Sequence, residues 1–274
     1  MGRDDYHARL RTQGINKPLY WGLRALTQPL LFLYFRISRT GADFIPREGG
    51  AIIAANHRSF LDPFVIAMLS HRPMYYVAKK ELFVKPGRAW LMNALGAFPI
   101  DRGASDQDAV DTARMLLERG ELVLIFPEGT RVRPGPLGVP KRGIGRLALE
   151  TGVPVVPVAV YGTEALRKGW RVYPHKVTVR AVAPLAFRRT EAPSQQLAAA
   201  VTNRLWPSVE LAWESLGGEP AAALENEPEW PVMEPSRRIF IRNPQLIRSR
   251  FGRDHDRVAA GVTPDEDERR KAQG

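Results

Sequence analysis

Short apolar runs alternate with stretches of helical periodicity through the middle of the chain. Strands are predicted for residues 50–56, 74–78, 97–100, 121–126, 153–161 and 176–183, and helices for residues 62–70, 86–95, 105–119, 143–151 and 194–216. Strands separated by helices favour an α/β fold, in which helices flank a layered, largely parallel mixed sheet. Polar residues that follow the strands are then expected to gather at one edge of that sheet.

The first 40 residues carry a different pattern. Apolar residues recur at helical spacing on one stripe, formed by Leu19, Leu23, Leu26, Leu30, Leu33 and Ile37. A bilayer span needs about 20 apolar residues, but Arg24, Gln28 and Arg36 interrupt this one. Pro29 is expected to bend the helix. We therefore expect residues 1–40 to form a membrane-associated helical hairpin, amphipathic and kinked, with its arginines among lipid phosphates. A first helix buried in the core is the alternative.

Composition narrows the choice of partners. The chain has no cysteine, and its 40 Lys and Arg against 29 Asp and Glu give a net charge of +11. Disulfide scaffolds and cysteine metal sites are excluded, and an anionic partner is favoured: nucleic acid, phospholipid or a phosphorylated metabolite. Residues 217–274 are rich in proline and charge without periodicity, so we expect a largely disordered tail after a folded domain in residues 41–216.

A histidine and an aspartate follow the first predicted strand of this domain. His57 leaves the strand, and Asp62, followed by Pro63, is expected to cap the next helix. A turn between them brings the carboxylate to one imidazole nitrogen and leaves the other nitrogen facing a pocket. This is the base-orienting half of a catalytic triad, able to take a proton from an external hydroxyl. The alternative is a local turn in which Asp62 only caps the helix.

Two arginines follow other predicted strands. Arg102 comes after residues 97–100, and Arg131 comes after residues 121–126. Guanidinium groups present forked donors to phosphate oxygens, so the pair predicts a phosphate clamp. Glu128 is expected to position one arginine or to bind a substrate hydroxyl. For each arginine alone, a surface ion pair is the alternative.

These residues lie in four blocks that resemble, in content and order, the motifs of the glycerolipid acyltransferases typified by lysophosphatidic acid acyltransferase. The blocks run from Asn56 to Asp62, from Gly96 to Arg102, from Phe126 to Arg131 and from Val153 to Val158. The resemblance covers about residues 50–165 of the chain. Pro99 is a mild departure from the family pattern, expected to affect strand geometry more than chemistry.

The resemblance implies transfer of a fatty acyl group from acyl-CoA or acyl carrier protein to the sn-2 hydroxyl of lysophosphatidic acid, giving phosphatidic acid in phospholipid biosynthesis. His57 is then the general base and Asp62 its partner. The residues implied to hold the glycerol phosphate are Arg102, Glu128, Gly129, Thr130 and Arg131, and those that support the motifs are Asn56, Ser59 and Pro127. Another lysophospholipid or a glycolipid hydroxyl is the alternative acceptor.

The chain lacks the motifs of covalent acyl transfer, phosphate loops and zinc hydrolases. We therefore expect no acyl-enzyme, no metal and no cofactor beyond the acyl thioester co-substrate. Backbone amides of residues 58–60 are expected to bind the oxyanion. Lys141, Arg142 and Gly143 begin a predicted helix, and such a start is able to bind a phosphate of coenzyme A. A surface loop is the alternative reading of that segment.

Because the implied acceptor and product are lipids, the protein is expected at a bilayer, as a peripheral or monotopic protein on the cytoplasmic face of the cell membrane. Deleting residues 1–40 is expected to release a folded domain. A basic nucleic-acid-binding module would expose aromatic residues among its cations, but Trp206 and Trp213 fall within a predicted helix. Nucleic acid is therefore not an expected partner. An inactive membrane scaffold is disfavoured by the intact His57 and Asp62.

Overall fold

The computed structural model describes residues 2–101, 106–132, 135–168 and 171–220. This part of the chain contains a seven-stranded sheet of order β1-β9-β6-β2-β5-β3-β4. Its strands are β1 (Ser38–Thr40), β2 (Ala51–Ala55), β3 (Met74–Lys79), β4 (Ala97–Ile100), β5 (Leu122–Ile125), β6 (Val155–Tyr161) and β9 (Thr178–Ala181). A separate two-stranded ribbon pairs β7 (Arg167–Lys168) with β8 (Arg171–Val172).

Within the large sheet, the strand pairs are parallel except for β6 and β9. The prediction of a largely parallel mixed sheet flanked by helices is confirmed. Strands β6, β2, β5, β3 and β4 run in the same direction, so their carboxyl ends share one edge of the sheet. Parallel strands are covered on both faces, which is why the central strand β2 reads as an unbroken apolar run and is buried throughout.

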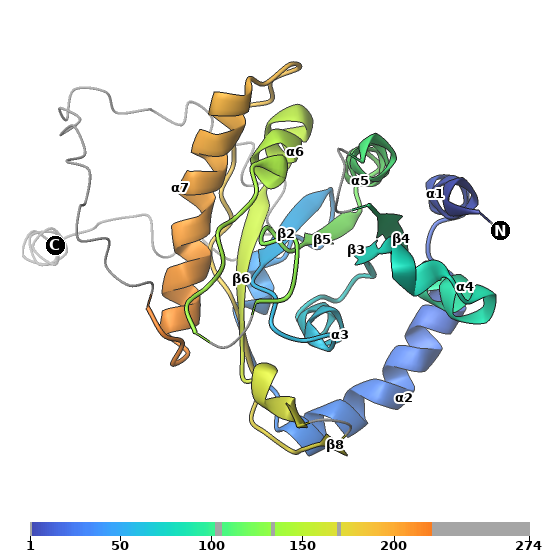
Figure 1. The fold of residues 1–274 in the computed structure, drawn as a ribbon, viewed down its shortest axis with the longest axis vertical. Helices are drawn as coiled ribbons and strands as arrows, with labels where there is room; N and C mark the ends of the chain where they lie inside the picture. Colours follow the sequence, from blue (N-terminus) through green and yellow to red (C-terminus); the bar gives the residue numbers. More distant parts are fainter. Residues whose placement is uncertain (1, 102–105, 133–134, 169–170, 221–274) are drawn as a thin grey trace, which may run out of the picture. The chain divides into compact units, whose positions relative to one another are not determined.

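Helices cover both faces of the sheet (Figure 1). They are α1 (Arg3–Thr12), α2 (Lys17–Phe35), α3 (Asp62–Ala67), α4 (Pro86–Ala94), α5 (Gln107–Glu118), α6 (Gly143–Thr151) and α7 (Gln195–Glu214), with the short 3-10 helices η1 (Ala42–Phe44), η2 (Lys80–Phe83) and η3 (Glu164–Leu166). Alternate residues of β2 enter two separate cores. Ile52 packs on the side of α1, α5, α6 and α7, whereas Ile53 packs on the side of α2 and α3.

Helix α1 belongs to the folded body. It packs on α5 and β4, and its side chains Tyr6, His7 and Leu10 are buried. Residues 1–40 thus contain two consecutive helices, as predicted, but α1 fills a place in the core on the far side of the sheet from α3. The association of this helix pair with a membrane stays a prediction. Removal of residues 1–40 would also strip Phe35 from the second core, so the expected release of a folded domain by that deletion is not supported.

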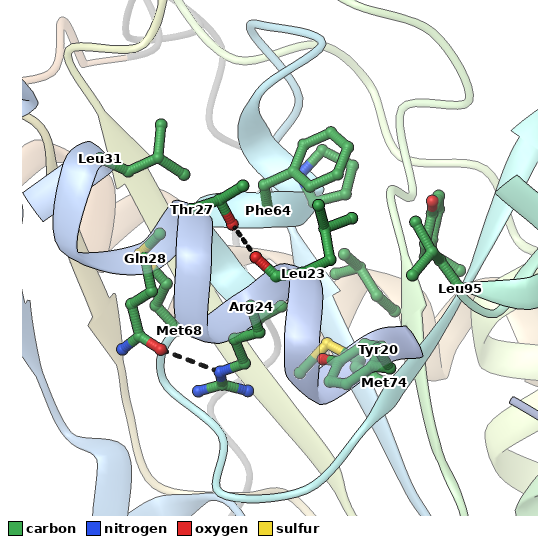
Figure 2. A pocket seen from close by; sticks show the side chains of 14 residues that line it. Tyr20, Leu23, Arg24, Thr27, Gln28, Leu31, Phe64, Met68, Met74 and Leu95 are labelled. Atoms are coloured by element: carbon green, nitrogen blue, oxygen red, sulfur yellow. Dashed lines mark hydrogen bonds between the residues drawn. The ribbon is translucent and has the colours of Figure 1, made fainter. Parts of the chain in front are cut away.

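Helix α2 is apolar on its outer face and partly polar on its inner face. Arg24 donates a hydrogen bond to Gln28 at 3.0 Å (Figure 2). Arg24 also reaches the body of the protein, where it donates to the carbonyl of Ser70 at 2.7 Å. Arg24 and Gln28 line a pocket between α2, α3 and the sheet. The predicted apolar stripe is divided, because Leu19 and Leu23 pack on the core while Leu26, Leu30 and Leu33 face outward and are 67%, 61% and 82% exposed.

Contacts on the inner face of α2 accommodate the charge of Arg24 within the protein. Arg24 finds backbone and side-chain acceptors within the protein and lies 5.1 Å from the ring of Trp21. Pro29 lies inside α2, which runs as one helix from Lys17 to Phe35. None of the helices in the described parts of the chain is both long and apolar enough to cross a bilayer.

Candidate active site

The loop after β2 is fastened to the neighbouring strand at its first residue. The side-chain amide of Asn56 donates to the carbonyl of Val160 at 2.9 Å and accepts from the N–H of the same residue at 2.8 Å. This pair replaces the sheet ladder at the point where β2 ends and β6 continues. Asn56 thereby fixes the position from which the next residue, His57, leaves the sheet.

His57 and Asp62 meet across a tight turn. Nδ1 of His57 lies 2.9 Å from Oδ2 of Asp62, whose side chain is fully buried. The same carboxylate oxygen accepts the backbone N–H groups of Arg58 at 2.6 Å and of Ser59 at 2.7 Å. Three donors thus hold one oxygen in place, and the imidazole is oriented with Nε2 left for a substrate.

Two details of this turn differ from the sequence-based expectations. Asp62 is the first residue of α3, not its N-cap, which is Leu61, because its carboxylate turns back toward residues 57–59. The expectation that amides of residues 58–60 bind an oxyanion also fails for Arg58 and Ser59, since both already donate to Asp62. Ser59 acts within the loop, where its hydroxyl oxygen accepts from the N–H of Leu61 at 3.4 Å.

An aromatic ring that sequence reasoning missed covers the imidazole. The ring of Phe126 stacks on that of His57 with centroids 4.0 Å apart and an angle of 17° between the planes. Phe126 follows β5, which pairs with β2 in parallel, so the two rings leave the sheet side by side. Its place at a strand end was visible in the sequence, but the stacking depends on which strands are neighbours.

Glu128 is buried and faces the backbone of the site. Its carboxylate accepts the N–H of His57 at 2.6 Å and the N–H of Gly138 at 2.8 Å. Burial raises the pKa of Glu128 to about 7, although these two backbone donors and the nearby Arg58 act in the opposite direction. Each carboxylate oxygen thus accepts one backbone donor, and the arginine whose charge acts on Glu128 is Arg58. The expected contact of Glu128 with a substrate hydroxyl stays a prediction.

Arg131 is held beside the histidine by the backbone. The N–H of Val132 donates to the carbonyl of His57 at 2.9 Å. Arg131 and Thr130 are exposed next to this bond, and Arg131 has no hydrogen bond or ion pair with another residue in the described ranges. Its guanidinium is therefore accessible to an anion. Arg102, the other half of the predicted clamp, lies outside the described residues.

Arg58 joins three parts of the site that are distant in sequence. Its guanidinium donates to the carbonyl of Gly135 and, at 3.1 Å, to that of Pro136, and it lies 4.8 Å from the ring of Trp213 on α7. These contacts hold the loop after β5 over the histidine turn. Sequence analysis did not single out Arg58, because nothing near it in the chain indicates a partner on α7.

The predicted donor residues lie at the start of α6, beside an open cleft. Lys141 and Gly143 line this cleft, which is open to solvent, together with Phe126 and Pro127. The N–H of Lys141 donates to the carbonyl of Pro127 at 2.8 Å. Arg142 is exposed at the N-cap of α6.

The close approach of Lys141 to the loop after β5 requires a glycine at position 129. Gly129 has a φ of +72°, and a Cβ there would lie 2.9 Å from Cε of Lys141. Most of the cleft wall is apolar, with side chains that include Val77, Ala113 and Leu147. The arrangement suits a ligand with an apolar chain and an anionic group near Lys141.

Comparison with known proteins adds independent information. The family model described as "Acyltransferase" matches residues 36–161. The chain is 34% identical over 136 residues to the chloroplastic 1-acyl-sn-glycerol-3-phosphate acyltransferase LPAT1 of Arabidopsis thaliana, a match that covers 48% of this chain and 38% of that protein. It is 32% identical over 157 residues to the 1-acyl-sn-glycerol-3-phosphate acyltransferase of Pseudomonas aeruginosa, covering 56% of this chain and 60% of that protein. The matches therefore span less than two thirds of these relatives.

The fold also has a solved counterpart. The crystal structure of the 1-acyl-sn-glycerophosphate (LPA) acyltransferase PlsC from Thermotoga maritima superposes with a TM-score of 0.55 at 25% identity, covering 78% of this chain and 84% of that chain. The matched region contains the loop of His57 and Asp62 and the loop of Glu128 and Arg131. Residues 36–161 thus match an acyltransferase model, and the chain resembles the glycerolipid acyltransferases, in particular the 1-acylglycerol-3-phosphate O-acyltransferases.

Proposed function

We propose that this protein transfers a fatty acyl group from an acyl thioester, acyl-CoA or acyl carrier protein, to the sn-2 hydroxyl of lysophosphatidic acid, giving phosphatidic acid. The observation that carries the proposal is the 2.9 Å hydrogen bond between His57 and a fully buried Asp62, in a domain that matches acyltransferases. A base oriented in this way serves an alcohol that comes from outside the protein, so no protein nucleophile is needed.

In the proposed reaction, His57 first accepts a proton from the acceptor hydroxyl and then donates it to the leaving thiolate. Nε2 of His57 removes the proton of the sn-2 hydroxyl while the hydroxyl oxygen attacks the carbonyl carbon of the thioester. The carbon–sulfur bond then breaks, and the proton passes from His57 to the departing thiolate. Asp62 stabilises the transient imidazolium and holds its ring in place. Phe126 limits the orientations of the same ring by stacking on it.

Binding of the acceptor phosphate is assigned to Arg131. Arg131 is exposed and directly precedes Val132, whose N–H donates to the carbonyl of His57. A phosphate bound by Arg131 would therefore place the glycerol close to the imidazole. Guanidinium groups bind phosphate through two parallel hydrogen bonds. By the resemblance described above, Arg102 is proposed as a second phosphate ligand, with Gly129 and Thr130 shaping the loop. Glu128 is proposed to act through the backbone of His57.

The acyl donor is proposed to bind in the cleft beside α6. Its apolar wall begins at Phe126, directly against His57, which suits an acyl chain whose thioester must reach the imidazole. Lys141 and Gly143 at the cleft, with Arg142 next to them, offer positive charge and a helix start for the phosphates of coenzyme A or of a carrier protein.

The protein is proposed to work at a membrane surface, because acceptor and product are lipids. The outward leucines of α2, Leu26, Leu30 and Leu33, form the apolar side of a helix that lies in the interface without spanning the bilayer. Attachment is proposed at the cytoplasmic face of the cell membrane, as a peripheral or monotopic protein. The net charge of +11 favours an anionic leaflet.

Release of free thiol from oleoyl-CoA in the presence of lysophosphatidic acid tests the proposal with the purified full chain. We expect turnover with the unmodified protein and none with His57→Ala. Arg131→Ala is expected to raise KM for lysophosphatidic acid more than for a lysophospholipid whose phosphate is esterified to a neutral alcohol. Leu197→Ala, an exposed change on α7, serves as the matched control. Full activity of His57→Ala would overturn the mechanism.

A further inference from the structure

A second group of exposed apolar side chains lies on η2 and α4, outside the site described above. It consists of Leu82, Val84, Trp90 and Leu91 and is called the η2–α4 surface. Val84 is 74% exposed and Trp90 is 48% exposed. Large apolar side chains that gather on one exposed element usually mark an interaction site.

The packing of neighbouring residues turns this surface outward. Between Leu82 and Val84, the ring of Phe83 points into the body and lies 5.3 Å from the ring of Tyr6 on α1. On α4, the buried side is formed by small or polar residues such as Ala89 and Asn93, and the amide of Asn93 donates to the carbonyl of Tyr6 at 3.1 Å. The large apolar residues therefore stay outside because the inner positions are already filled.

The segment that carries the η2–α4 surface has an excess of positive charge. Residues 79–91 include the cations Lys79, Lys80, Lys85 and Arg88 and one acid, Glu81. Lys79 forms an ion pair with Glu81 at 3.2 Å and Lys80 forms one with Asp101, so the excess charge lies on Lys85 and Arg88. The guanidinium of Arg88 donates to the carbonyls of Leu82 at 2.9 Å and of Glu81 at 3.2 Å, so it fastens α4 to η2. A tryptophan among leucines and basic residues is typical of segments that lie at the boundary between lipid and water.

The surface borders the same edge of the sheet as the reactive loops. Helix η2 begins directly after β3, His57 follows β2, and Arg131 lies in the loop after β5. These three strands are neighbours and run in parallel. Phe60, in the turn between His57 and Asp62, is also exposed at this edge. A flat partner that touches the η2–α4 surface would therefore also approach the histidine.

We propose that the η2–α4 surface is a second membrane contact, which rests on a leaflet of anionic phospholipid and turns the carboxyl edge of the sheet toward it. This contact is additional to the attachment through α2 that forms part of the proposed function. Its biological role, access to a lipid acceptor, rests on the proposed function. A second copy of the chain is the less suitable occupant, because a symmetric dimer would bring this cationic surface against itself.

Sedimentation with vesicles tests the contact without any reaction. The probes are vesicles of equal parts phosphatidylglycerol and phosphatidylcholine, and vesicles of phosphatidylcholine alone. The double variant Val84→Asp/Trp90→Asp is compared with Met115→Asp/Leu197→Asp, which adds the same charge at exposed apolar positions of α5 and α7. We expect the first variant to lose about tenfold in partitioning onto the anionic vesicles and the control less than twofold.

The comparison isolates the η2–α4 surface from any contribution of α2, because α2 is unchanged in both double variants. Equal partitioning of the two double variants would overturn the proposal, provided that both melt at the temperature of the unmodified protein. Loss of a dimer in Val84→Asp/Trp90→Asp, with unchanged partitioning, would also overturn it and assign the surface to a second copy.

Activity gives a second and separable readout. With a short-chain lysophosphatidic acid that stays monomeric in water, the Val84→Asp/Trp90→Asp variant should turn over as the unmodified protein does. With the acceptor embedded in anionic vesicles, its rate should fall in parallel with its partitioning. An equal fall with the monomeric acceptor would count against the proposal. If the unmodified protein acylates neither acceptor, the proposed function fails, while the vesicle result still decides the membrane contact.

Discussion

The side-chain carboxylate of Glu128 accepts the backbone N–H of His57 at 2.6 Å. Its other oxygen accepts the N–H of Gly138 at 2.8 Å, so one buried side chain connects the loop after β2 with the loop after β5. The position of the imidazole depends on this backbone, and small displacements of a reacting group are costly to catalysis. Glu128 is therefore a positioning residue, which acts on the reaction through His57.

The variant Glu128→Gln should weaken both the fold and the reaction. A glutamine amide offers one acceptor oxygen, so one of the two backbone N–H groups is left without its partner. We expect a loss of about 1–3 kcal/mol in the free energy of unfolding, measured by urea denaturation at pH 5, where the carboxyl of Glu128 is protonated in the folded protein and the cost of burying its charge does not enter the comparison. We also expect kcat to fall more than KM changes. A variant with unaltered stability and kcat would contradict the role given to Glu128.

The raised pKa of Glu128 predicts a pH dependence of stability. Burial raises this pKa from an ordinary value of 4.5 to about 7. Between these values the folded protein keeps a proton that the unfolded chain releases, so the free energy of unfolding should fall as the pH rises from 4.5 to 7 and then level off. Glu128→Gln should lack this component. Urea denaturation at pH 5 and pH 7.5 measures this change in the free energy of unfolding. An equal change in Glu128→Gln and in the unmodified protein would refute the prediction.

Replacing the partner of the histidine should reduce turnover strongly. In Asp62→Asn, the side-chain oxygen still accepts hydrogen bonds, but the negative charge that stabilises the imidazolium is gone. From the behaviour of catalytic triads, we expect kcat to fall roughly 10⁴-fold. Thiol release measures the fall, and circular dichroism checks that the variant is folded. Turnover within a few-fold of the unmodified protein would show that Asp62 only shapes the turn.

Substitutions on α2 should separate membrane binding from folding. The outward change Leu30→Ser removes no buried contact, so we expect stability to change by no more than about 0.5 kcal/mol while vesicle binding weakens. The inward change Leu23→Ser is the matched control, since Leu23 packs on the core, and it should lower stability by about 1–3 kcal/mol. Thermal denaturation and vesicle sedimentation compare the two. Equal effects on both readouts would contradict the orientation of α2.

Local pattern was sufficient to predict most of the framework. The strand Ala97–Ile100 and the helix Gly143–Thr151 have the predicted bounds, because alternation and helical period are properties of neighbouring residues. The turn that joins His57 to Asp62 is also short enough for spacing to predict it. Helix α1 was not predicted as part of the core, since its sequence is mainly polar and only contact with α5 and β4 explains its buried face.

The sequence by itself thus determined most of the strands and helices of the α/β domain, the basic character of the chain and the histidine–aspartate turn. The short strands β1, β7 and β8 were not predicted. Only the tertiary structure decided that Arg58 meets Trp213, that Phe126 stacks on His57 and that Glu128 faces the backbone. It also decided which side of α2 faces outward. These relationships depend on β2 lying next to β5 and β6. Strands that are distant in sequence pair without any local periodicity, so the sequence pattern does not predict which strands become neighbours.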